Sequence, residues 1–238
     1  MLPLSLAGLG ALAASTVIAA PASSAASTPQ ETAASVISQV SKTVAKQDAV
    51  RLVVVGKSSS ASSGERLVVD AGRTSGDETA HQGGAKITVK VTPAGCYFAG
   101  NTTGLKNMIG LTAAQAKTVG SRWVSLAKKS TQCTNLASDV SLHLIDTMLP
   151  TAKGTTLSHA TVHGQHRDIL RWVTAATSTA PKLTTTLVVT HGNRALPLKE
   201  TTKAATGDET VLFSHWGERI VVHAPAAHAT IAYTKVTA

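Results

Sequence analysis

The first 30 residues of this 238-residue chain contain no lysine, arginine, aspartate or glutamate. Leu2 to Ala20 is an apolar run, and the small residues Ala22 to Ala26 follow it. An apolar run before small residues is typical of a secretory signal peptide, so we predict one over residues 1–26. The positive charges that usually precede the apolar run are absent, and a transmembrane anchor is the alternative.

Cysteine is rare, since only Cys96 and Cys133 occur. Neither lies near the predicted cleavage site, so no lipid anchor is expected there. A signal peptide places the mature chain outside the cytoplasm, secreted or in the cell envelope, where paired cysteines form disulfides. We therefore predict a Cys96–Cys133 bridge; two buried free thiols are the alternative.

Acidic residues are also few, 13 against 22 lysines and arginines, which gives a formal net charge of +9. The basic residues are scattered, without a run of five or more, so nucleic acid is not expected as a partner. Peripheral contact with an anionic membrane or with cell-wall polymers is one interpretation of the excess. A merely solvated surface is the other.

Aromatic residues make up 3% of the chain, and several of them gather between Gly95 and Leu126. A strand over 95–101, a helical pair over 104–119 and a strand opening at Trp123 are predicted there. Because aromatic side chains bury the most area per residue, much of the core should close at this point. Trp123 is expected to be buried where the helices meet the sheet.

Hydrophobic periodicity predicts one mixed domain over residues 27–238. A helix is expected from about Pro29 to Lys46, capped by Thr28, because apolar residues recur there at helical spacing. Thr74 to Gly84 reads as a polar connection between strands. The pattern is α+β, because strands and helices do not alternate. The other predicted elements are strands near 50–55, 67–71, 87–91, 155–162, 168–175, 183–190, 210–215, 219–223 and 229–236, and a second helix over 134–148.

Catalytic signatures are missing. The Gly56-Lys57-Ser58 sequence lacks the earlier glycine of a phosphate-binding loop, and no Gly-x-Ser-x-Gly elbow occurs. We therefore predict neither an enzyme nor a cofactor. His159, His163 and His166 cluster in the sequence, but residues three apart on a strand face opposite sides, and no carboxylate or cysteine is expected to join them nearby. No metal site is expected.

Several segments together resemble a known family. The chain looks like exported lipoprotein-like proteins of actinobacteria, which are similar in fold to LolA/LolB-like outer-membrane lipoprotein carriers and to mycobacterial glycolipid-carrying lipoproteins. The resemblance implies an antiparallel β half-barrel with helices over its concave face. The segments that carry it are Tyr97–Asn101, Gly110–Thr112 with Ala116, Ser121–Ser125, Val162–Gln165 and Phe213–Gly217 followed by Ala224-Pro225.

The resemblance implies a non-enzymatic carrier of a lipid or glycolipid, expected to be a monomer. The acyl part would lie between the concave sheet face and the helices. An exported structural or partner-binding protein with a filled core is the alternative, and a hydrolase is a remote one. The predicted acyl contacts are apolar residues that share helix faces: Val36, Ile37, Val40, Leu105, Met108 and Ile109.

Overall fold

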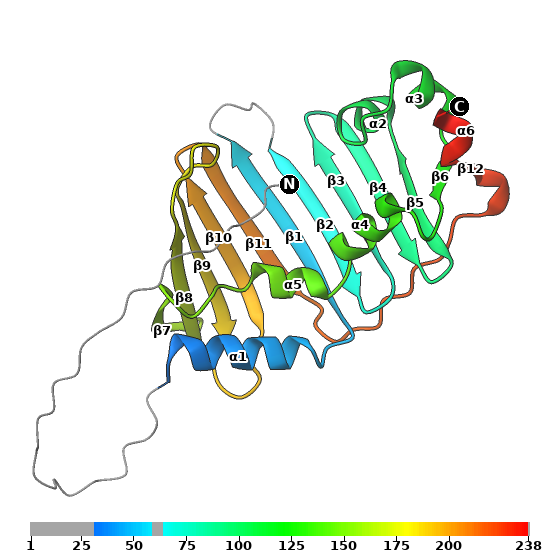
Figure 1. The fold of residues 1–238 in the computed structure, drawn as a ribbon. Helices are drawn as coiled ribbons and strands as arrows, with labels where there is room; N and C mark the ends of the chain where they lie inside the picture. Colours follow the sequence, from blue (N-terminus) through cyan, green and yellow to red (C-terminus); the bar gives the residue numbers. More distant parts are fainter. Residues whose placement is uncertain (1–30, 59–63, 238) are drawn as a thin grey trace, which may run out of the picture. The chain divides into compact units, whose positions relative to one another are not determined.

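The computed structural model describes residues 31–58 and 64–237, so the predicted signal peptide lies outside the described residues. Twelve strands form one sheet (Figure 1). Their spatial order is β12-β6-β5-β4-β3-β2-β1-β11-β10-β9-β8-β7. Among the strand pairs of the described residues, β12–β6 alone is parallel. The strands are β1 (Ala49–Ser58), β2 (Glu65–Gly72), β3 (Gly76–Gln82), β4 (Ala85–Thr92), β5 (Gly95–Gly100), β6 (Trp123–Leu126), β7 (Thr156–Val162), β8 (Gln165–Thr174), β9 (Leu183–Thr190), β10 (Pro197–Ala204), β11 (Gly207–Ser214) and β12 (Thr230–Ala232).

The helices gather on one face of this sheet. The Cys96–Cys133 disulfide, with Cα atoms 5.4 Å apart, ties one of them to β5 and confirms the predicted bridge. Within residues 31–58 and 64–237 no helix is long and apolar enough to cross a membrane. The helices are α1 (Ala33–Val44), α2 (Thr102–Asn107), α3 (Ala113–Val119), α4 (Thr131–Asp139), α5 (His143–Met148), the 3₁₀ turn η1 (Ala227–Ala229) and α6 (Tyr233–Thr237).

Strand register decides which side chains meet the helices. Val50 lies opposite Ala71 on β2, and from there the pairing runs across β3 and β4 to Cys96 on β5. Residues directly opposite one another point to the same side of a sheet. The face that carries Val50, Leu52 and Cys96 is therefore the one that α4 covers, and we call it the inner face. Figure 1 shows α1 and α5 on the same side.

The inner face holds most of the core. Leu52 is 1% exposed and Phe98 is 2% exposed, whereas Leu212 on the outer face is 46% exposed. The predicted α+β class, with an antiparallel sheet and helices on one face, is confirmed, although the sheet is open because β12 and β7 are unpaired edges among the described residues.

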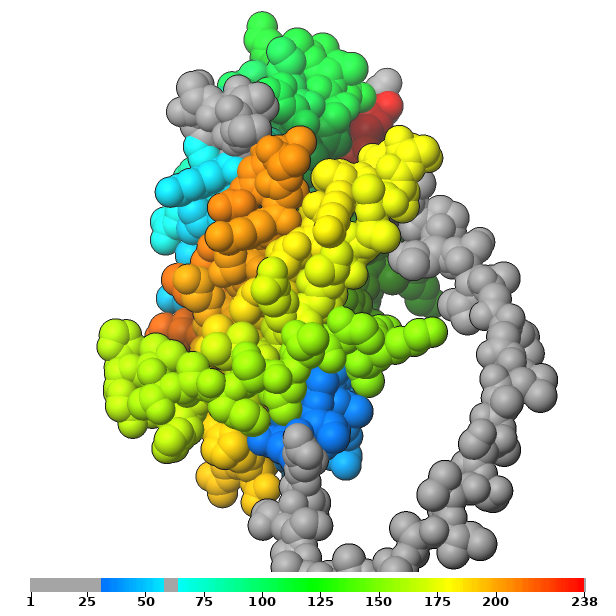
Figure 2. Space-filling model, turned by 90° about the vertical axis from the view of Figure 1, so that its left-hand side faces the viewer, coloured from blue at the N-terminus to red at the C-terminus, as the bar shows by residue number. Residues whose placement is uncertain are grey.

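Helix α1 starts later than the sequence suggested. The cap is Thr32, whose hydroxyl accepts from the Ser35 backbone N–H while the Ser35 side chain accepts from the Thr32 backbone N–H. This reciprocal pair satisfies donors that the first turn leaves free, so the helix begins at Ala33. The predicted cap, Thr28, lies outside the described residues. Figure 2 shows α1, in blue, against the edge of the sheet formed by β7 and β8.

Four other expectations about helices and strands are wrong. The predicted strand 229–236 is shortened to β12, because the chain turns into α6 at Tyr233. The polar segment 74–84 contains β3, which pairs along both sides with β2 and β4. The predicted helix 134–148 breaks between α4 and α5, because the Leu142 N–H donates to the Gly72 carbonyl at the end of β2. Residues 219–223 form no strand, and β10 takes the place beside β11 instead. Strand β10 was missed because its sequence, PLKETTKA, has little apolar alternation.

Trp123 lies half-buried on the outer face, so its predicted burial beneath the helices is wrong. Its neighbour Val124 pairs with Phe98 on the inner face, and alternation turns Trp123 the other way. The Lys90 ammonium lies 5.1 Å from the centre of the Trp123 ring.

We expect Trp123→Ala to lower the free energy of unfolding by about 1–2 kcal/mol, the loss of part of the apolar area and one cation–π contact. Full burial would make the cost about 3–5 kcal/mol. Denaturant unfolding distinguishes the two values, and a loss in the larger range would contradict the outer-face placement.

Candidate functional site

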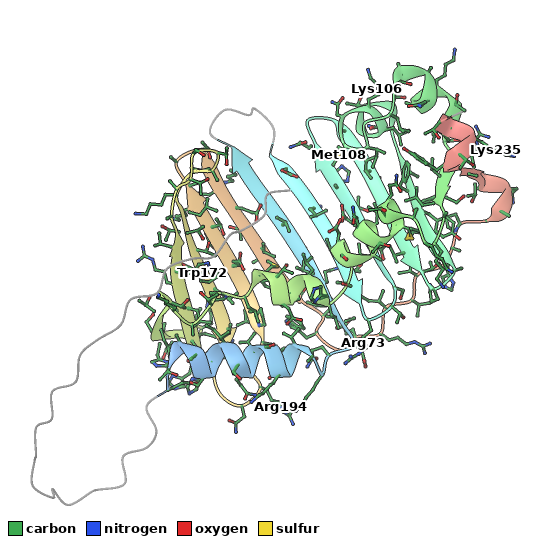
Figure 3. The ribbon with its side chains drawn as sticks, in the orientation of Figure 1. Arg73, Lys106, Met108, Trp172, Arg194 and Lys235 are labelled. Atoms are coloured by element: carbon green, nitrogen blue, oxygen red, sulfur yellow. A yellow bond between two sulfur atoms is a disulfide. The ribbon has the colours of Figure 1, made fainter. Side chains whose placement is uncertain are left out.

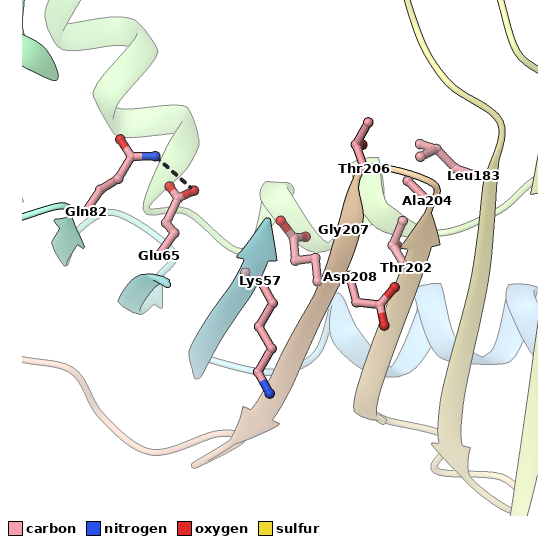
Figure 4. Close-up of a pocket in the computed structure, with 11 residues that line it drawn as sticks. Lys57, Glu65, Gln82, Leu183, Thr202, Ala204, Thr206, Gly207 and Asp208 are labelled. Carbon is pink, nitrogen blue, oxygen red and sulfur yellow. Dashed lines mark hydrogen bonds between the residues drawn. The ribbon is translucent and has the colours of Figure 1, made fainter. Parts of the chain in front are cut away.

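A cavity of about 700 Å³ opens on the sheet at the end of β1 that lies away from α1 (Figure 4). Strands β1, β2, β3, β9, β10 and β11 contribute to it. We call it the inner-face cavity, since most of its lining side chains belong to that face. The lining residues are Gly56, Lys57, Glu65, Gln82, Leu183, Thr202, Ala204, Thr206, Gly207, Asp208 and Glu209.

Two carboxylates flank a glycine in the lining of the cavity. Gly56 on β1 lies opposite Glu65 on β2 and opposite Glu209 on β11. With no side chain at Gly56, both glutamates face one space. Partial burial raises the pKa of Glu209, and the charge of Glu65 raises it further. The Gln82 amide donates to Glu65 over 3.5 Å, as the dashed line in Figure 4 shows.

A third glutamate lies next along the inner face. Glu200 on β10 is 8% exposed, and its Oε2 has no hydrogen-bond partner among the described residues. Burial, followed by the charge of Glu209, raises the pKa of Glu200 to about 7. Below that pH the side chain is neutral and can donate a hydrogen bond. Thr202, two residues on, shares a 3.1 Å hydrogen bond with Thr185.

An apolar row lies directly beside these polar groups. Glu200 pairs with Val211 on one side and Leu187 on the other, and Leu187 pairs with Leu170. The three apolar side chains are at most 2% exposed. On the inner face, the carboxylates and hydroxyls of the cavity are therefore direct neighbours of closely packed apolar side chains.

The polar groups of the lining are mainly hydrogen-bond acceptors. Among residues 31–58 and 64–237, the lining contains no serine, cysteine or histidine. Its carboxylates, amide and hydroxyls accept hydrogen bonds from hydroxyl or ammonium groups. Leu183 on β9 and Ala204 on β10 add apolar surface beside them.

The predicted acyl contacts lie away from this cavity, in two separate groups. Val36 and Val40 on α1 and Leu105 on α2 are at most 1% exposed and belong to the core. Ile37, Met108 and Ile109 are partly buried against it. Helix α2 packs on β4, whereas α1 lies at the β7 side of the sheet (Figure 1). Figure 3 labels Met108 and Trp172 on these opposite sides. Their role with lipid stays a prediction.

The sequence did not predict the cavity glutamates, because strand topology brings them together. Glu65 and Glu209 are far apart in the chain and meet only because β1 pairs with both β2 and β11. Within one strand, the alternation Glu209, Val211, Phe213 was a usable signal. It places a carboxylate on the same face as two core residues.

The histidines are arranged differently from the expectation. His163 occupies the β7–β8 turn with a φ of 51°, followed by Gly164 with a φ of 75°. His159 lies directly opposite Asp168, so the reasoning that no carboxylate stands beside it is wrong. Asp168 also contacts His191, whose pKa it raises by a hydrogen bond and by its charge. With Glu31 these residues form a group that could hold a metal ion.

No protein-family model and no curated protein matches this chain. Similar solved structures include the lipoprotein LprF from Mycobacterium bovis, with 14% identity, 82% of this chain and 97% of that chain covered, and a TM-score of 0.48. The Mycobacterium tuberculosis lipoprotein LppX has 11% identity, covers 80% and 98%, and has a TM-score of 0.47. A LolA superfamily protein from Nitrosomonas europaea has 10% identity, covers 81% and 96%, and has a TM-score of 0.30.

Mycobacterial lipoproteins and LolA-like proteins are the kinds of protein that the sequence resemblance named. All three TM-scores lie below 0.5.

Proposed function

We propose that this protein is a non-enzymatic carrier of a lipid or glycolipid outside the cytoplasm. The observation that carries the proposal is the inner-face cavity, where Glu65, Gln82 and Glu209 lie beside an apolar row on the same sheet face. An amphipathic ligand matches this arrangement. Its hydroxylated or cationic head would lie against the carboxylates, and its acyl part would follow the apolar row.

The acyl part needs space that packing now fills. Val211, Leu187 and Leu170 are buried, as are Val36 and Val40 on α1. For an acyl chain to reach this row, α1 and α5 would have to move away from the sheet. Val36, Ile37 and Val40 on α1 would then meet ligand on the helix side, and the partly buried Ile37 would be the first reached. Leu105, Met108 and Ile109 lie over the β4 side of the sheet and would meet ligand only if the acyl part extended that far.

The disulfide supports an extracytoplasmic location, because structural disulfides persist in oxidising compartments. The net charge of +9 would favour peripheral contact with anionic head groups or cell-wall polymers. A monomer is the simplest form of this proposal.

Filling the cavity should abolish lipid binding. Ala204→Trp places an indole on the inner face within the cavity, and the adjacent Lys203→Trp places the same group on the outer face. We expect organic-solvent extracts of the exported wild-type protein and of Lys203→Trp to contain a lipid by mass spectrometry. The extract of Ala204→Trp should contain at least about tenfold less, since steric exclusion from a filled cavity removes most of the binding free energy.

Circular dichroism serves as the folding control for both variants. Equal lipid in the two tryptophan variants would move the site away from the cavity. An absence of lipid in the wild type expressed in an exporting actinobacterial host would favour the partner-binding alternative with a filled core.

A further inference from the structure

A cluster of four chemically matched side chains lies at the other end of the inner face, where α1 begins. His159 comes from β7, Asp168 from β8, His191 follows the end of β9, and Glu31 directly precedes the cap of α1. We call these residues the His–Asp cluster. They bring the start of α1 and three strands to one point, although His191 is separated from Glu31 by 160 positions along the chain.

The nitrogen and oxygen atoms of the cluster converge. Asp168 Oδ1 lies 2.9 Å from His159 Nδ1 and 2.7 Å from His191 Nδ1. Glu31 Oε2 lies 3.7 Å from His191 Nδ1. One ligand atom from each of the four residues lies within 4.8 Å of the others. Ligands of a tetrahedral zinc ion stand roughly 3.3 Å apart when the metal–ligand bonds are about 2.0–2.1 Å, so these separations already approach that geometry.

Burial of the carboxylate is a second, independent observation. The Asp168 side chain is 1% exposed, and its Oδ2 has no hydrogen-bond partner within the described part of the chain. A buried carboxylate oxygen without a partner is costly, and buried charges are normally paired or bound to a metal. The two imidazoles contact only Oδ1, so half of the carboxylate's acceptor capacity is unused.

We propose that the His–Asp cluster binds a divalent transition-metal ion, with zinc as the best-matched ion. Two imidazole nitrogens and two carboxylates form a four-ligand donor set that suits zinc, whereas calcium and magnesium prefer oxygen alone. The ion's two positive charges equal the two negative charges of Asp168 and Glu31. The bound ion fastens the chain before α1 to β7, β8 and β9, so its role is structural.

The site is reachable from solvent. The side chains of His159 and His191 are 55% and 47% exposed, and a metal ion can enter between them. This exposure also makes them good targets for substitution, because removing a half-exposed imidazole leaves the core intact. His81 is an exposed histidine on β3 and serves as the matched control.

The test is a titration of chelator-treated, exported protein with zinc chloride, followed by calorimetry and by the melting temperature. We expect one zinc per chain and a higher melting temperature with zinc than with calcium or magnesium. His159→Ala and His191→Ala should each weaken zinc binding by more than about 100-fold, because loss of a direct ligand exceeds the 10–100-fold effect of losing a second-shell partner. His81→Ala should bind as the wild type does.

Circular dichroism confirms that the alanine variants fold before zinc is added. Folded His159→Ala and His191→Ala proteins with wild-type zinc affinity would overturn the proposal, and so would a wild type without stoichiometric binding. Neither result depends on lipid, so the metal proposal and the carrier proposal fail separately.

Discussion

Glu200→Gln is expected to stabilise the protein above pH 7 and to remove part of the pH dependence of its stability. Burial holds the pKa of Glu200 at about 7 in the folded state, against an ordinary value of 4.5. The folded chain therefore keeps this proton over a pH range in which the unfolded chain releases it. Stability is unaffected well below pH 4.5, where both states are protonated, and it falls as the pH rises toward 7.

The difference between the folded and unfolded pKa of Glu200 sets the size of the loss in stability. One unit of pKa corresponds to about 1.4 kcal/mol, so the loss from Glu200 approaches about 3 kcal/mol and is complete above pH 7. Glu78 on β3 adds a loss of the same sign, because burial and then the charge of Asp139 raise its pKa to about 7. Glutamine has nearly the same shape as glutamate but no charge, so Glu200→Gln avoids the loss at that position.

Denaturant unfolding at a series of pH values between 4 and 8 measures this effect. We expect the wild type to lose stability across that interval, Glu200→Gln to lose less, and Glu200→Gln/Glu78→Gln to lose least. Glu218→Gln, at an exposed position after β11, is the matched control and should keep the wild-type slope. A Glu200→Gln variant with the full wild-type slope would mean that Glu200 is not a buried acid.

Removal of the disulfide is expected to lower the free energy of unfolding by about 4 kcal/mol. Cys96 and Cys133 are 37 positions apart, and a cross-link over a loop of that length removes substantial conformational entropy from the unfolded chain. The bridge also holds α4 on β5, where both cysteines are at most 4% exposed. Without it, α4 is held by its packing against β4, β5 and α5.

The variant Cys96→Ala/Cys133→Ala tests this expectation without placing a hydroxyl in the core. Its unfolding midpoint should agree with that of reduced wild-type protein, since both lack the cross-link. An unfolding free energy equal to that of the oxidised wild type would show that the bridge does not constrain the unfolded state. Reduced and mutant proteins that differ widely would instead point to packing effects of the substitutions.

The sequence by itself determined most of the local structure. Period-two alternation in Ile87, Val89 and Val91 predicted β4, and the apolar spacing of Val36, Val40 and Val44 predicted the buried stripe of α1. Two cysteines in a chain with an export-like start were enough to predict the bridge. These features depend on neighbours within a few residues, or on the number of cysteines, so they can be predicted without knowledge of the fold.

Wrong predictions arose where partners far along the chain decide the outcome. Strand β3 is polar, yet it forms because β2 and β4 supply hydrogen bonds on both sides. The break between α4 and α5 depends on the carbonyl of Gly72. Trp123 was assigned to the wrong face because a one-residue difference in register turns a side chain to the opposite side of a sheet.

Only the tertiary structure decided the candidate functional surfaces. The pairing of β1 with β11 brings Glu209 to Gly56, more than 150 positions earlier in the sequence. The order β9-β8-β7 brings His191 to Asp168 and His159. Alternation within a strand gives the face of each side chain, but it does not give the neighbouring strand. Sites built across strands therefore follow from sheet order, which long-range backbone pairing sets.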